Sequence, residues 1–385
     1  MTLEDTVKET KAYYCLECGK CSGLCPVSRY NPAYSPRVMV ENALLGLEDD
    51  LVCNRELFSC LTCYACLPKC PSDVDYPLFM QKLRALASNN GQHGDCAHSG
   101  VLQSLMRLMA NPTLKQRRLE WLSNGHRTSD QSDVLYFVGC APYFEPIFED
   151  TGVKSLDIAK DSLKILNSLG ITPRLLTDER CCGHDMLWTG DVETFKRLAE
   201  LNAAAIKEAG VKKIIFSCAE CYRTFKNDYP NYVNIDCELQ HISEFLSEKI
   251  EKGEVSFTEV KKKLTYHDPC RLGRHLGIYE PPRKVIESIP GIELVEMKEN
   301  RAESLCCGTS AFTNCDSCSK QIRVERLLEA KATGAESIIT CCPKCQIHFR
   351  CAMVNKGEVK GPDVEIEVMN LVNLVAQALG GKSSE

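Results

Sequence analysis

The sequence predicts a mixed protein of α+β or α/β class, with a mainly helical N-terminal domain followed by two similar α/β domains. The first 90 or so residues contain nine cysteines and helix-like stretches but few strand-like runs. From residue 133 onward, short apolar runs alternate with segments of helical periodicity. The cysteine pattern of this second part occurs twice: Cys270 follows Cys140 by 130 residues, and Cys342 follows Cys218 by 124. Such a near-constant offset indicates an internal duplication.

In the N-terminal part, periodicity predicts helices over residues 36–47 and 77–87 and an amphipathic helix over residues 100–123. A polar stretch at residues 123–130 is typical of a linker. We therefore expect three domains, over residues 1–125, 131–255 and 260–385. The amphipathic helix, with Arg117 and Arg118 beyond its apolar face, either packs the N-terminal domain onto the rest of the chain or docks a partner.

The two α/β domains are predicted from alternating strand and helix patterns. The first contains expected strands at residues 134–138 and 211–216 and helices at 156–169 and 193–209. The second contains expected strands at residues 264–266, 292–297 and 337–340 and helices at 283–288, 319–332 and 369–379. Key cysteines directly follow several of these strands, namely Cys140, Cys218, Cys270 and Cys342. Because ligands of open α/β sheets collect beyond the carboxyl ends of the strands, we expect a cysteine cluster at the equivalent edge of each domain.

The cysteine content is unusual in a chain of otherwise ordinary composition. Its 385 residues include 25 cysteines, carry a net charge of −6 and are 44% hydrophobic. The mild negative charge offers no basic surface for nucleic acid. A disulfide framework is disfavoured because the cysteine count is odd and the first residues lack the features of a signal segment. No run is long and apolar enough for a membrane span. We expect a cytoplasmic protein whose reduced cysteines bind metal or perform redox chemistry.

Two cysteine runs in the N-terminal part share one spacing, Cys-x2-Cys-x2-Cys-x3-Cys-Pro. This run is typical of proteins with two cubane [4Fe–4S] clusters, in which the fourth cysteine of each run ligates the other cluster. Zinc sites are the alternative, but zinc ribbons use paired Cys-x2-Cys knuckles instead. The spacing assigns one cluster to Cys15, Cys18, Cys21 and Cys70, and the other to Cys60, Cys63, Cys66 and Cys25.

The later cysteines form a less familiar pattern that occurs twice. A leading cysteine is followed by a Cys-Cys-Gly triplet, Cys181-Cys182-Gly183 or Cys306-Cys307-Gly308, and then by a Cys-x2-Cys pair. Adjacent cysteines rarely share one tetrahedral metal, because successive side chains diverge. Five thiolates also exceed what one zinc or one cubane requires. The pattern therefore suggests an unusual cluster with more than four protein ligands.

This repeated pattern resembles the paired CCG domains of the heterodisulfide reductase family. The domain order is similar to that of the family's D-type protein, or to a fusion of its C-type and B-type proteins, and the sequence from His267 to Cys270 resembles the family's second leading motif. The resemblance implies two non-cubane [4Fe–4S] clusters, each held by five cysteines. These would be Cys140, Cys181, Cys182, Cys218 and Cys221 for one cluster, and Cys270, Cys306, Cys307, Cys342 and Cys345 for the other.

The resemblance also implies a function. Electrons would pass from the two cubane clusters to the two non-cubane clusters, which would reduce a disulfide, of the CoM-S-S-CoB heterodisulfide type, clamped between them. The alternative is a non-catalytic electron relay in a larger flavin-based electron-bifurcating complex or aromatic acyl-CoA reductase complex. A third interpretation, the iron–sulfur component of a hydroxy-acid dehydrogenase, is disfavoured because both motifs are complete.

A redox partner protein is expected because the sequence lacks a phosphate loop or dinucleotide fingerprint. The partner in a multi-subunit complex would be a flavoprotein, such as one of the family's A type, or a membrane cytochrome b protein. The second partner would tether an otherwise cytoplasmic protein to a membrane.

Reduction of a disulfide to two thiols also consumes two protons. His184, which follows Gly183, and His267, three residues before Cys270, are the candidate catalytic proton donors, with His275 as a third. Each could instead hydrogen-bond to cluster sulfur or pack against a strand end.

Other polar groups near these motifs have less defined roles. The arginines Arg180, Arg271 and Arg274 would tune a cluster or bind an anionic substrate. The seven remaining cysteines are expected to be inert thiols, although Cys315 and Cys318 have the spacing of a redox dithiol. Cys341 adjoins Cys342, and the 124-residue offset selects Cys342 as the ligand.

Overall fold

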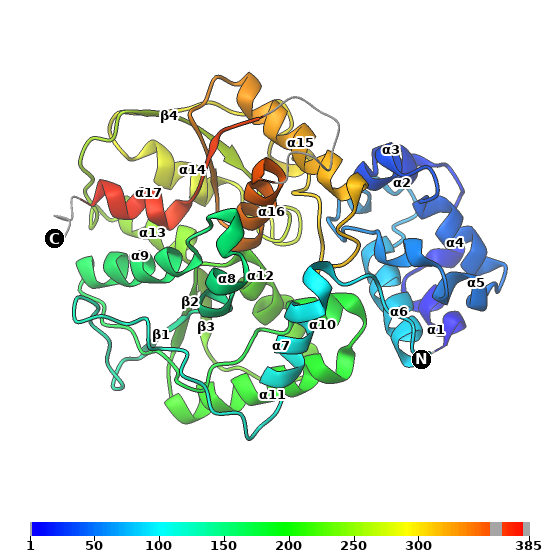
Figure 1. Ribbon diagram of the computed structural model, residues 1–385, viewed down its shortest axis with the longest axis horizontal. Helices are drawn as coiled ribbons and strands as arrows, with labels where there is room; N and C mark the ends of the chain where they lie inside the picture. The colour runs from blue at the N-terminus through cyan, green and yellow to red at the C-terminus, as the bar shows by residue number, and fades with distance from the viewer. Residues whose placement is uncertain (1, 355–363, 380–385) are drawn as a thin grey trace.

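The N-terminal domain is built from short helices whose boundaries follow from local capping residues. The computed structural model describes residues 2–354 and 364–379, and this domain forms one end of the molecule (Figure 1). Ser35 caps a helix that begins at Pro36, and Asp75 caps the longest helix of the domain. The helices are α1 (Leu3–Glu9), α2 (Lys20–Leu24), α3 (Pro26–Tyr30), α4 (Pro36–Leu44), α5 (Glu48–Val52) and α6 (Tyr76–Asn89). The helices expected over residues 36–47 and 77–87 correspond to α4 and α6.

The amphipathic helix predicted over residues 100–123 is wrong in its second half. Helix α7 spans only Val101–Met109, and the chain then runs through turns and irregular segments. Pro112 explains the end of the helix, because proline lacks an N–H donor and disfavours helical geometry at Asn111 before it. Partner docking through Arg118, one of the two roles left open for this segment, does not fit the structure, because this side chain is buried inside the protein.

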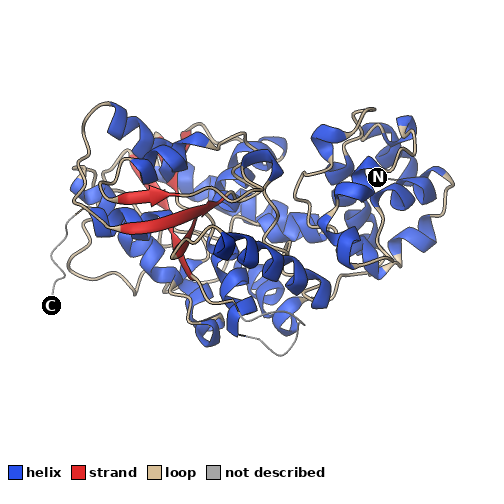
Figure 2. Ribbon diagram, turned by 90° about the horizontal axis from the view of Figure 1, so that it is seen from above, coloured by secondary structure: helices blue, strands red, loops and turns tan. Residues whose placement is uncertain are grey.

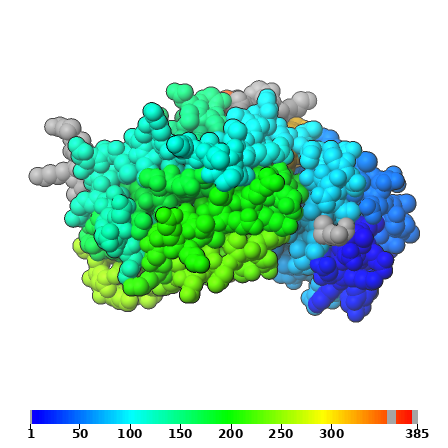
Figure 3. All heavy atoms as spheres, turned by 90° about the horizontal axis from the view of Figure 1, so that it is seen from below, coloured from blue at the N-terminus to red at the C-terminus, as the bar shows by residue number. Residues whose placement is uncertain are grey.

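As the packing alternative predicted, helix α7 fastens the N-terminal domain to the rest of the chain. Gln103 donates a hydrogen bond to the carbonyl oxygen of Ala311 at 3.1 Å, and Arg107 pairs with Asp191 at 2.9 Å. These contacts reach different α/β units of the protein. Figure 3 shows the N-terminal lobe lying against the first of these units.

The first α/β unit contains a parallel sheet of order β1-β2-β3. Its strands are β1 (Val134–Phe137), β2 (Lys213–Phe216) and β3 (Glu238–His241). Its helices are α8 (Ala141–Ile147), α9 (Ser155–Ser168), α10 (His184–Thr189), α11 (Val192–Ala209), α12 (Ala219–Arg223) and α13 (Ile242–Glu251). The two strands and two helices predicted here all form, whereas β3 was not predicted.

The second unit contains a parallel sheet of order β5-β4-β6-β7. Its strands are β4 (Lys262–His267), β5 (Ile292–Leu294), β6 (Ser337–Thr340) and β7 (Glu367–Asn370). Its helices are α14 (Glu280–Glu287), α15 (Ser317–Ala332), α16 (Pro343–Val354) and α17 (Leu371–Ala378). Strand β5 is shorter than predicted, and residues 369–370, expected to begin the last helix, end β7 instead.

The two sheets arrange their strands alike. The order β1-β2-β3 of the first sheet corresponds to the order β4-β6-β7 of the second. In the first unit, a parallel bridge between Leu135 on β1 and Arg174 stands at the position where β5 pairs with β4 in the second unit. Helices α9 and α17 pack against each other, and Asn373 donates to Asp161 at 2.7 Å across this contact. Figure 2 shows that the strands lie in the part of the molecule away from the N-terminal domain. Among the described residues, no helix combines the length and apolar character needed to cross a membrane.

A buried arginine joins the N-terminal domain to the first unit. Arg84 on α6 donates to the carbonyl oxygens of Leu57 at 3.0 Å, Cys60 at 2.7 Å and Trp188 at 2.8 Å. Helix α10 approaches α6 closely because residue 190 is glycine. A Cβ atom at Gly190 would lie 2.2 Å from the carbonyl oxygen of Arg84. The contact therefore requires a residue without a side chain.

We predict that Gly190→Ala lowers the free energy of unfolding by more than the strain of placing an alanine at a positive φ. Gly190 has a φ of 92°, and Gly210, with a φ of 63° and open space around it, is a matched control. Gly210→Ala should cost about 1–2 kcal/mol, and Gly190→Ala about 1–3 kcal/mol more because of overpacking. Anaerobic denaturant unfolding measures both. Equal losses in the two variants would contradict the packing argument.

Candidate functional site

The five cysteines predicted as ligands in the first unit lie together. Cys140 follows β1, Cys181 and Cys182 precede α10, and Cys218 and Cys221 flank the start of α12. Direct thiol contacts join Cys140 to Cys181, Cys182 to Cys221, and Cys218 to Cys221. All five line one cavity whose other walls include apolar side chains such as Val138, Phe144 and Ile158.

The five predicted ligands of the second unit are grouped in the same way. Thiol contacts join Cys270 to Cys306, Cys307 to Cys345, and Cys342 to Cys345. The paired strand ends His267 and Thr340 bring the loops that carry Cys270 and Cys342 together. Cys341 points elsewhere and interacts with Tyr266, so the structure places Cys342 rather than Cys341 in the group.

The glycine of each Cys-Cys-Gly triplet has a clear structural role. Gly183 and Gly308 have φ values of 81° and 84°. A Cβ at Gly308 would lie 2.5 Å from the carbonyl oxygen of Ser319 on α15, and one at Gly183 would lie 2.7 Å from the ring of Phe195 on α11. Glycine therefore lets the cysteine pair approach the neighbouring helix.

The eight predicted cubane ligands separate into two groups in the N-terminal domain. Cys70 lines a cavity with Cys15, Cys18 and Cys21, although it belongs to the other run, and Cys66 also borders this cavity. Cys25 in turn lies near Cys60, Cys63 and Cys66 of the second run. It interacts electrostatically with each of these three thiols. The backbone N–H of Thr62 donates to the sulfur of Cys60 at 3.3 Å. This crossing of the fourth cysteine agrees with the sequence pattern, and the ligand assignment itself stays a prediction.

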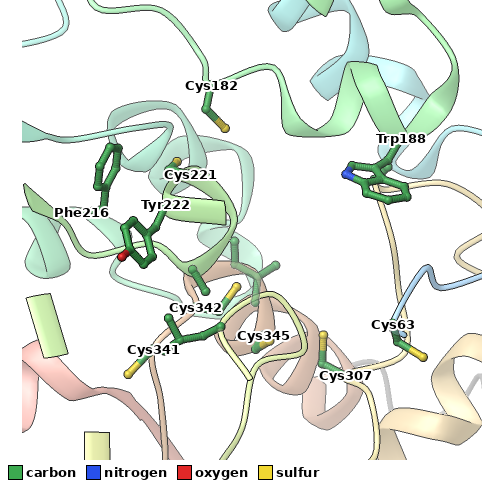
Figure 4. Packing of buried hydrophobic residues seen from close by; sticks show 14 of the residues in the cluster. Cys63, Cys182, Trp188, Phe216, Cys221, Tyr222, Cys307, Cys341, Cys342 and Cys345 are labelled. Atoms are coloured by element: carbon green, nitrogen blue, oxygen red, sulfur yellow. The ribbon is translucent and has the colours of Figure 1, made fainter. Parts of the chain in front are cut away.

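Two thiol contacts connect the cysteine groups of different domains. Cys63 of the N-terminal domain contacts Cys306 of the second unit. Cys342 of the second unit contacts Cys218 of the first unit. Figure 4 shows Cys63 on the side of Cys307 and away from Cys182 and Cys221. The groups therefore form a series from the N-terminal domain to the second unit and then to the first.

Positive charge lies at the junction between Cys63 and Cys306. The Cys306 thiol hydrogen-bonds to Cys63 and lowers the pKa of Cys63 to about 5, and the charge of Arg274 adds to this effect against the opposing effect of burial. Arg274 donates from Nε to the carbonyl oxygen of Cys63 at 2.6 Å. The arginine therefore both holds the loop and stabilises a thiolate, the form of cysteine that binds metal.

Arg271 is a second buried arginine at this junction. It donates to the carbonyl and hydroxyl oxygens of Thr62, both at 2.6 Å, and to Nε2 of His184 at 2.9 Å. Its guanidinium lies 4.6 Å from the ring centre of Trp188. His275, the third histidine candidate, contacts Arg271 at 2.6 Å and belongs to the same joint.

The third arginine named from the sequence, Arg180, has its two terminal guanidinium nitrogens engaged elsewhere. They bond to Asp178 and to backbone carbonyls at and after the end of α7, at Met109, Asn111 and Leu114.

His184 lies in a buried charged cluster that sequence reasoning did not find. Because Arg271 can only donate, Nε2 of His184 accepts, and Nδ1 then donates to Asp185 at 2.9 Å. Burial, helped by the charge of Arg271, lowers the pKa of His184 well below its ordinary value. Lys344 pairs with Asp185, and with Glu220 at 2.7 Å. Lys344 stands between two predicted ligands in the sequence, which is the one local signal that could have singled it out.

His267 lies beside the second cysteine group. Arg326 donates from Nε to Nδ1 of His267 at 3.2 Å. A ring nitrogen of His267 and the sulfurs of Cys307 and Cys345 lie within 4.8 Å of one another. His348, which the sequence analysis did not select, places Nδ1 3.2 Å from the same Cys307 sulfur.

A buried ion pair positions two cysteine loops of the first unit. Arg118 and Glu179 have fully buried side chains and pair at 2.5 Å. The Glu179 carboxylate also accepts the N–H groups of Val138 at 3.1 Å and Gly139 at 2.8 Å, just before Cys140. Since Glu179 is itself two residues before Cys181, the pair ties the first cysteine to the Cys-Cys-Gly turn.

Comparison with known proteins first establishes the class. Residues 14–75 match the family described as a 4Fe-4S dicluster domain, and residues 134–226 and 264–350 each match the cysteine-rich CCG domain. The predicted ligands fit such cofactors, because the groups offer thiols at their centres and apolar walls around them. The chain is an iron–sulfur protein of the electron-transferring oxidoreductase class.

The relatives then define the family. The D subunit of dihydromethanophenazine:CoB–CoM heterodisulfide reductase from Methanosarcina acetivorans is 32% identical over 398 residues, covering 95% of this chain and 93% of the relative. The B subunit of fumarate reductase (CoM/CoB) from Methanothermobacter marburgensis is 29% identical, covering 97% and 74%. The chain belongs to the heterodisulfide reductase family and is of its D type. A hypothetical protein from Helicobacter pylori, 11% identical, shares the fold with a TM-score of 0.61 over all of this chain and 78% of its own.

We predict that Arg118→Met lowers the free energy of unfolding by about 3–5 kcal/mol, because it leaves the buried Glu179 carboxylate without its partner. Arg118→Met combined with Glu179→Gln should recover part of this loss, because it removes the unpaired charge. The single amide oxygen can accept from only one of Val138 and Gly139, which bond to different carboxylate oxygens. Arg117, whose side chain is 86% exposed, provides the control, and Arg117→Met should change stability by less than about 0.5 kcal/mol. Anaerobic denaturant unfolding measures all three. A loss in the double variant as large as in Arg118→Met would refute the charge argument.

Proposed function

We propose that this chain carries electrons from a partner protein to a disulfide of the CoM-S-S-CoB heterodisulfide type and reduces it. When bound, two cubane and two non-cubane [4Fe–4S] clusters would supply single-electron redox chemistry along the chain. The observation that carries the proposal is the pair of contacts Cys63–Cys306 and Cys342–Cys218, which connects the cysteine groups in one series. A family relative named as part of a CoB–CoM heterodisulfide reductase supports the substrate class.

The proposed ligands are the cysteines selected from the sequence. The outer cubane would be held by Cys15, Cys18, Cys21 and Cys70, and the inner one by Cys25, Cys60, Cys63 and Cys66. The non-cubane clusters would be held by Cys270, Cys306, Cys307, Cys342 and Cys345 in the second unit, and by Cys140, Cys181, Cys182, Cys218 and Cys221 in the first. Arg271 and Arg274 hold the loop of Cys60 and Cys63 against the second unit, which fixes the position of this junction.

The disulfide would bind where the two α/β units meet. The cavity beside the first cysteine group is also lined by Pro343 and Lys344 of the second unit. Asp185 and Glu220 pair with Lys344 and hold its ammonium group at this boundary. Cleavage consumes two electrons and two protons and yields two thiols. His184 and His267 stay the predicted proton donors, and Arg271 and Asp185 fix the position of the His184 ring.

Electrons would enter at the outer end of the N-terminal domain. Cys18 is exposed there, and its neighbours Tyr14 and Leu16 are 54% and 70% exposed. Large apolar side chains exposed around a redox centre provide a surface for a protein partner. The partner would be a flavoprotein, such as one of the family's A type, or a membrane cytochrome b protein. Membership in a multi-subunit complex agrees with the relatives, which are named as subunits.

The proposed reaction is tested with the anaerobically prepared full chain, reduced viologen and the coenzyme M–coenzyme B heterodisulfide. We expect release of both thiols with oxidation of two viologens for each disulfide consumed. The control replaces the heterodisulfide with buffer and should oxidise no viologen beyond the background. If the fully loaded chain oxidises viologen with a protein acceptor but releases no thiol, the chain is an electron relay, as the alternative interpretation holds.

Adjacent cysteines give a matched test of the ligand assignment. Cys342→Ser should lower the iron content by about four atoms per chain, because it removes a predicted ligand of one four-iron cluster. Cys341→Ser should keep full iron content, since Cys341 interacts with Tyr266 instead. Iron analysis and the spectra of the cubane clusters measure the two variants. Iron loss in Cys341→Ser together with retention in Cys342→Ser would reverse the assignment.

A further inference from the structure

The two cysteine groups of the α/β units have different surroundings at one equivalent sulfur. Cys182 and Cys307 are the second cysteines of their Cys-Cys-Gly triplets. The sulfur of Cys307 has two histidines beside it, His267 at the end of β4 and His348 on α16. Both histidines are buried.

The hydrogen bonds around His267 determine which nitrogen carries the proton. An arginine side chain has only donors, so Nδ1 of His267 must accept the hydrogen bond from Arg326. The proton of the neutral ring is therefore on Nε2. This atom has no hydrogen-bond partner in the described part of the chain, and a ring nitrogen of His267 lies within 4.8 Å of the Cys307 sulfur. Burial lowers the pKa of His267, in agreement with a neutral ring.

His348 approaches the same sulfur from helix α16, whereas His267 approaches it from the end of strand β4. Its Nδ1 lies 3.2 Å from the Cys307 sulfur, within the distance of an N–H···S hydrogen bond. The Phe312 ring contacts the imidazole edge-on with centroids 5.6 Å apart and holds its orientation. A thiolate sulfur can only accept, so His348 donates from Nδ1 when Cys307 is ionised.

The first unit has no imidazole at either corresponding position. His267 is three residues before Cys270, and Phe137 is three residues before Cys140. His348 is three residues after Cys345, and Thr224 is three residues after Cys221. Phe137 packs among aromatic rings, including Phe225 at 4.8 Å between centroids, so this position serves the core.

We propose that His267 and His348 donate hydrogen bonds to Cys307 and make the iron–sulfur centre of the second unit the more easily reduced of the two. Reduction adds negative charge, and N–H donors to ligand sulfur favour the more negative state. The proposal rests on the five-cysteine centres of the proposed function but not on the disulfide reaction. It gives the two units of one fold different redox properties.

The test converts the second unit to the pattern of the first with His267→Phe and His348→Thr in the full chain. Iron content and a redox titration followed by electron paramagnetic resonance are the readouts. At a fixed applied potential near the midpoint, the ratio of reduced to oxidised centre should fall about tenfold, which for one electron corresponds to 59 mV. The signals of the other centres should not move. Thr224→Val in the first unit is the matched control and should leave the second centre unchanged.

A conservative variant separates tuning from structure. His348→Gln retains an N–H donor and should shift the ratio less than His348→Thr. An unchanged ratio in a fully iron-loaded double variant would overturn the proposal. Iron loss in both His348→Thr and His348→Gln would also overturn it, by assigning the imidazole to holding the centre. If the shift is found but the unmodified chain releases no thiol, the disulfide function fails and this inference stands.

Discussion

The arrangement of the cysteine groups depends on one buried guanidinium, that of Arg271. The residue directly follows Cys270 of the second unit, and it donates to Thr62 of the N-terminal domain and to His184 of the first unit. Burying such a charge costs free energy unless every donor is satisfied. Two oxygens of Thr62, an imidazole nitrogen and the face of Trp188 supply these partners. Three domains are therefore fixed relative to one another at the point where their cysteines meet.

The two α/β units place similar scaffolds around chemically different surroundings. Parallel strands bring Cys140 and Cys218, or Cys270 and Cys342, to the same sheet edge, because their carboxyl ends coincide. Around the first group the additional polar residues are two carboxylates, a lysine and His184, whereas around the second they are two imidazoles on one cysteine and an arginine. A shared fold thus positions the sulfurs, and the residues beside them differentiate the two centres.

Much of the fold was predictable because its signals are local. Strand and helix periods over a few residues predicted β1, β2, β4, β5 and β6 and the helices α9, α11, α14, α15 and α17. Strand β3 was missed because Glu238–His241 is short and polar at its start, and it pairs only through β2. The helix predicted over residues 100–123 was too long, because Leu119 and Leu122 continue its apolar pattern. Pro112 ends the helix, and the two leucines pack against the core from irregular segments instead.

The sequence by itself determined the cysteine motifs, the iron–sulfur class and the order of the domains, because cluster ligands recur at short spacings along the chain. Only the tertiary structure decided which motifs meet. The contact of Cys63 with Cys306 and the pairing of Lys344 with Asp185 join residues far apart in the sequence. These pairs form because helix α6 packs on α10 and because the carboxyl ends of the strands in the two units lie close together. Packing between distant segments leaves no periodic signal in the sequence of either segment.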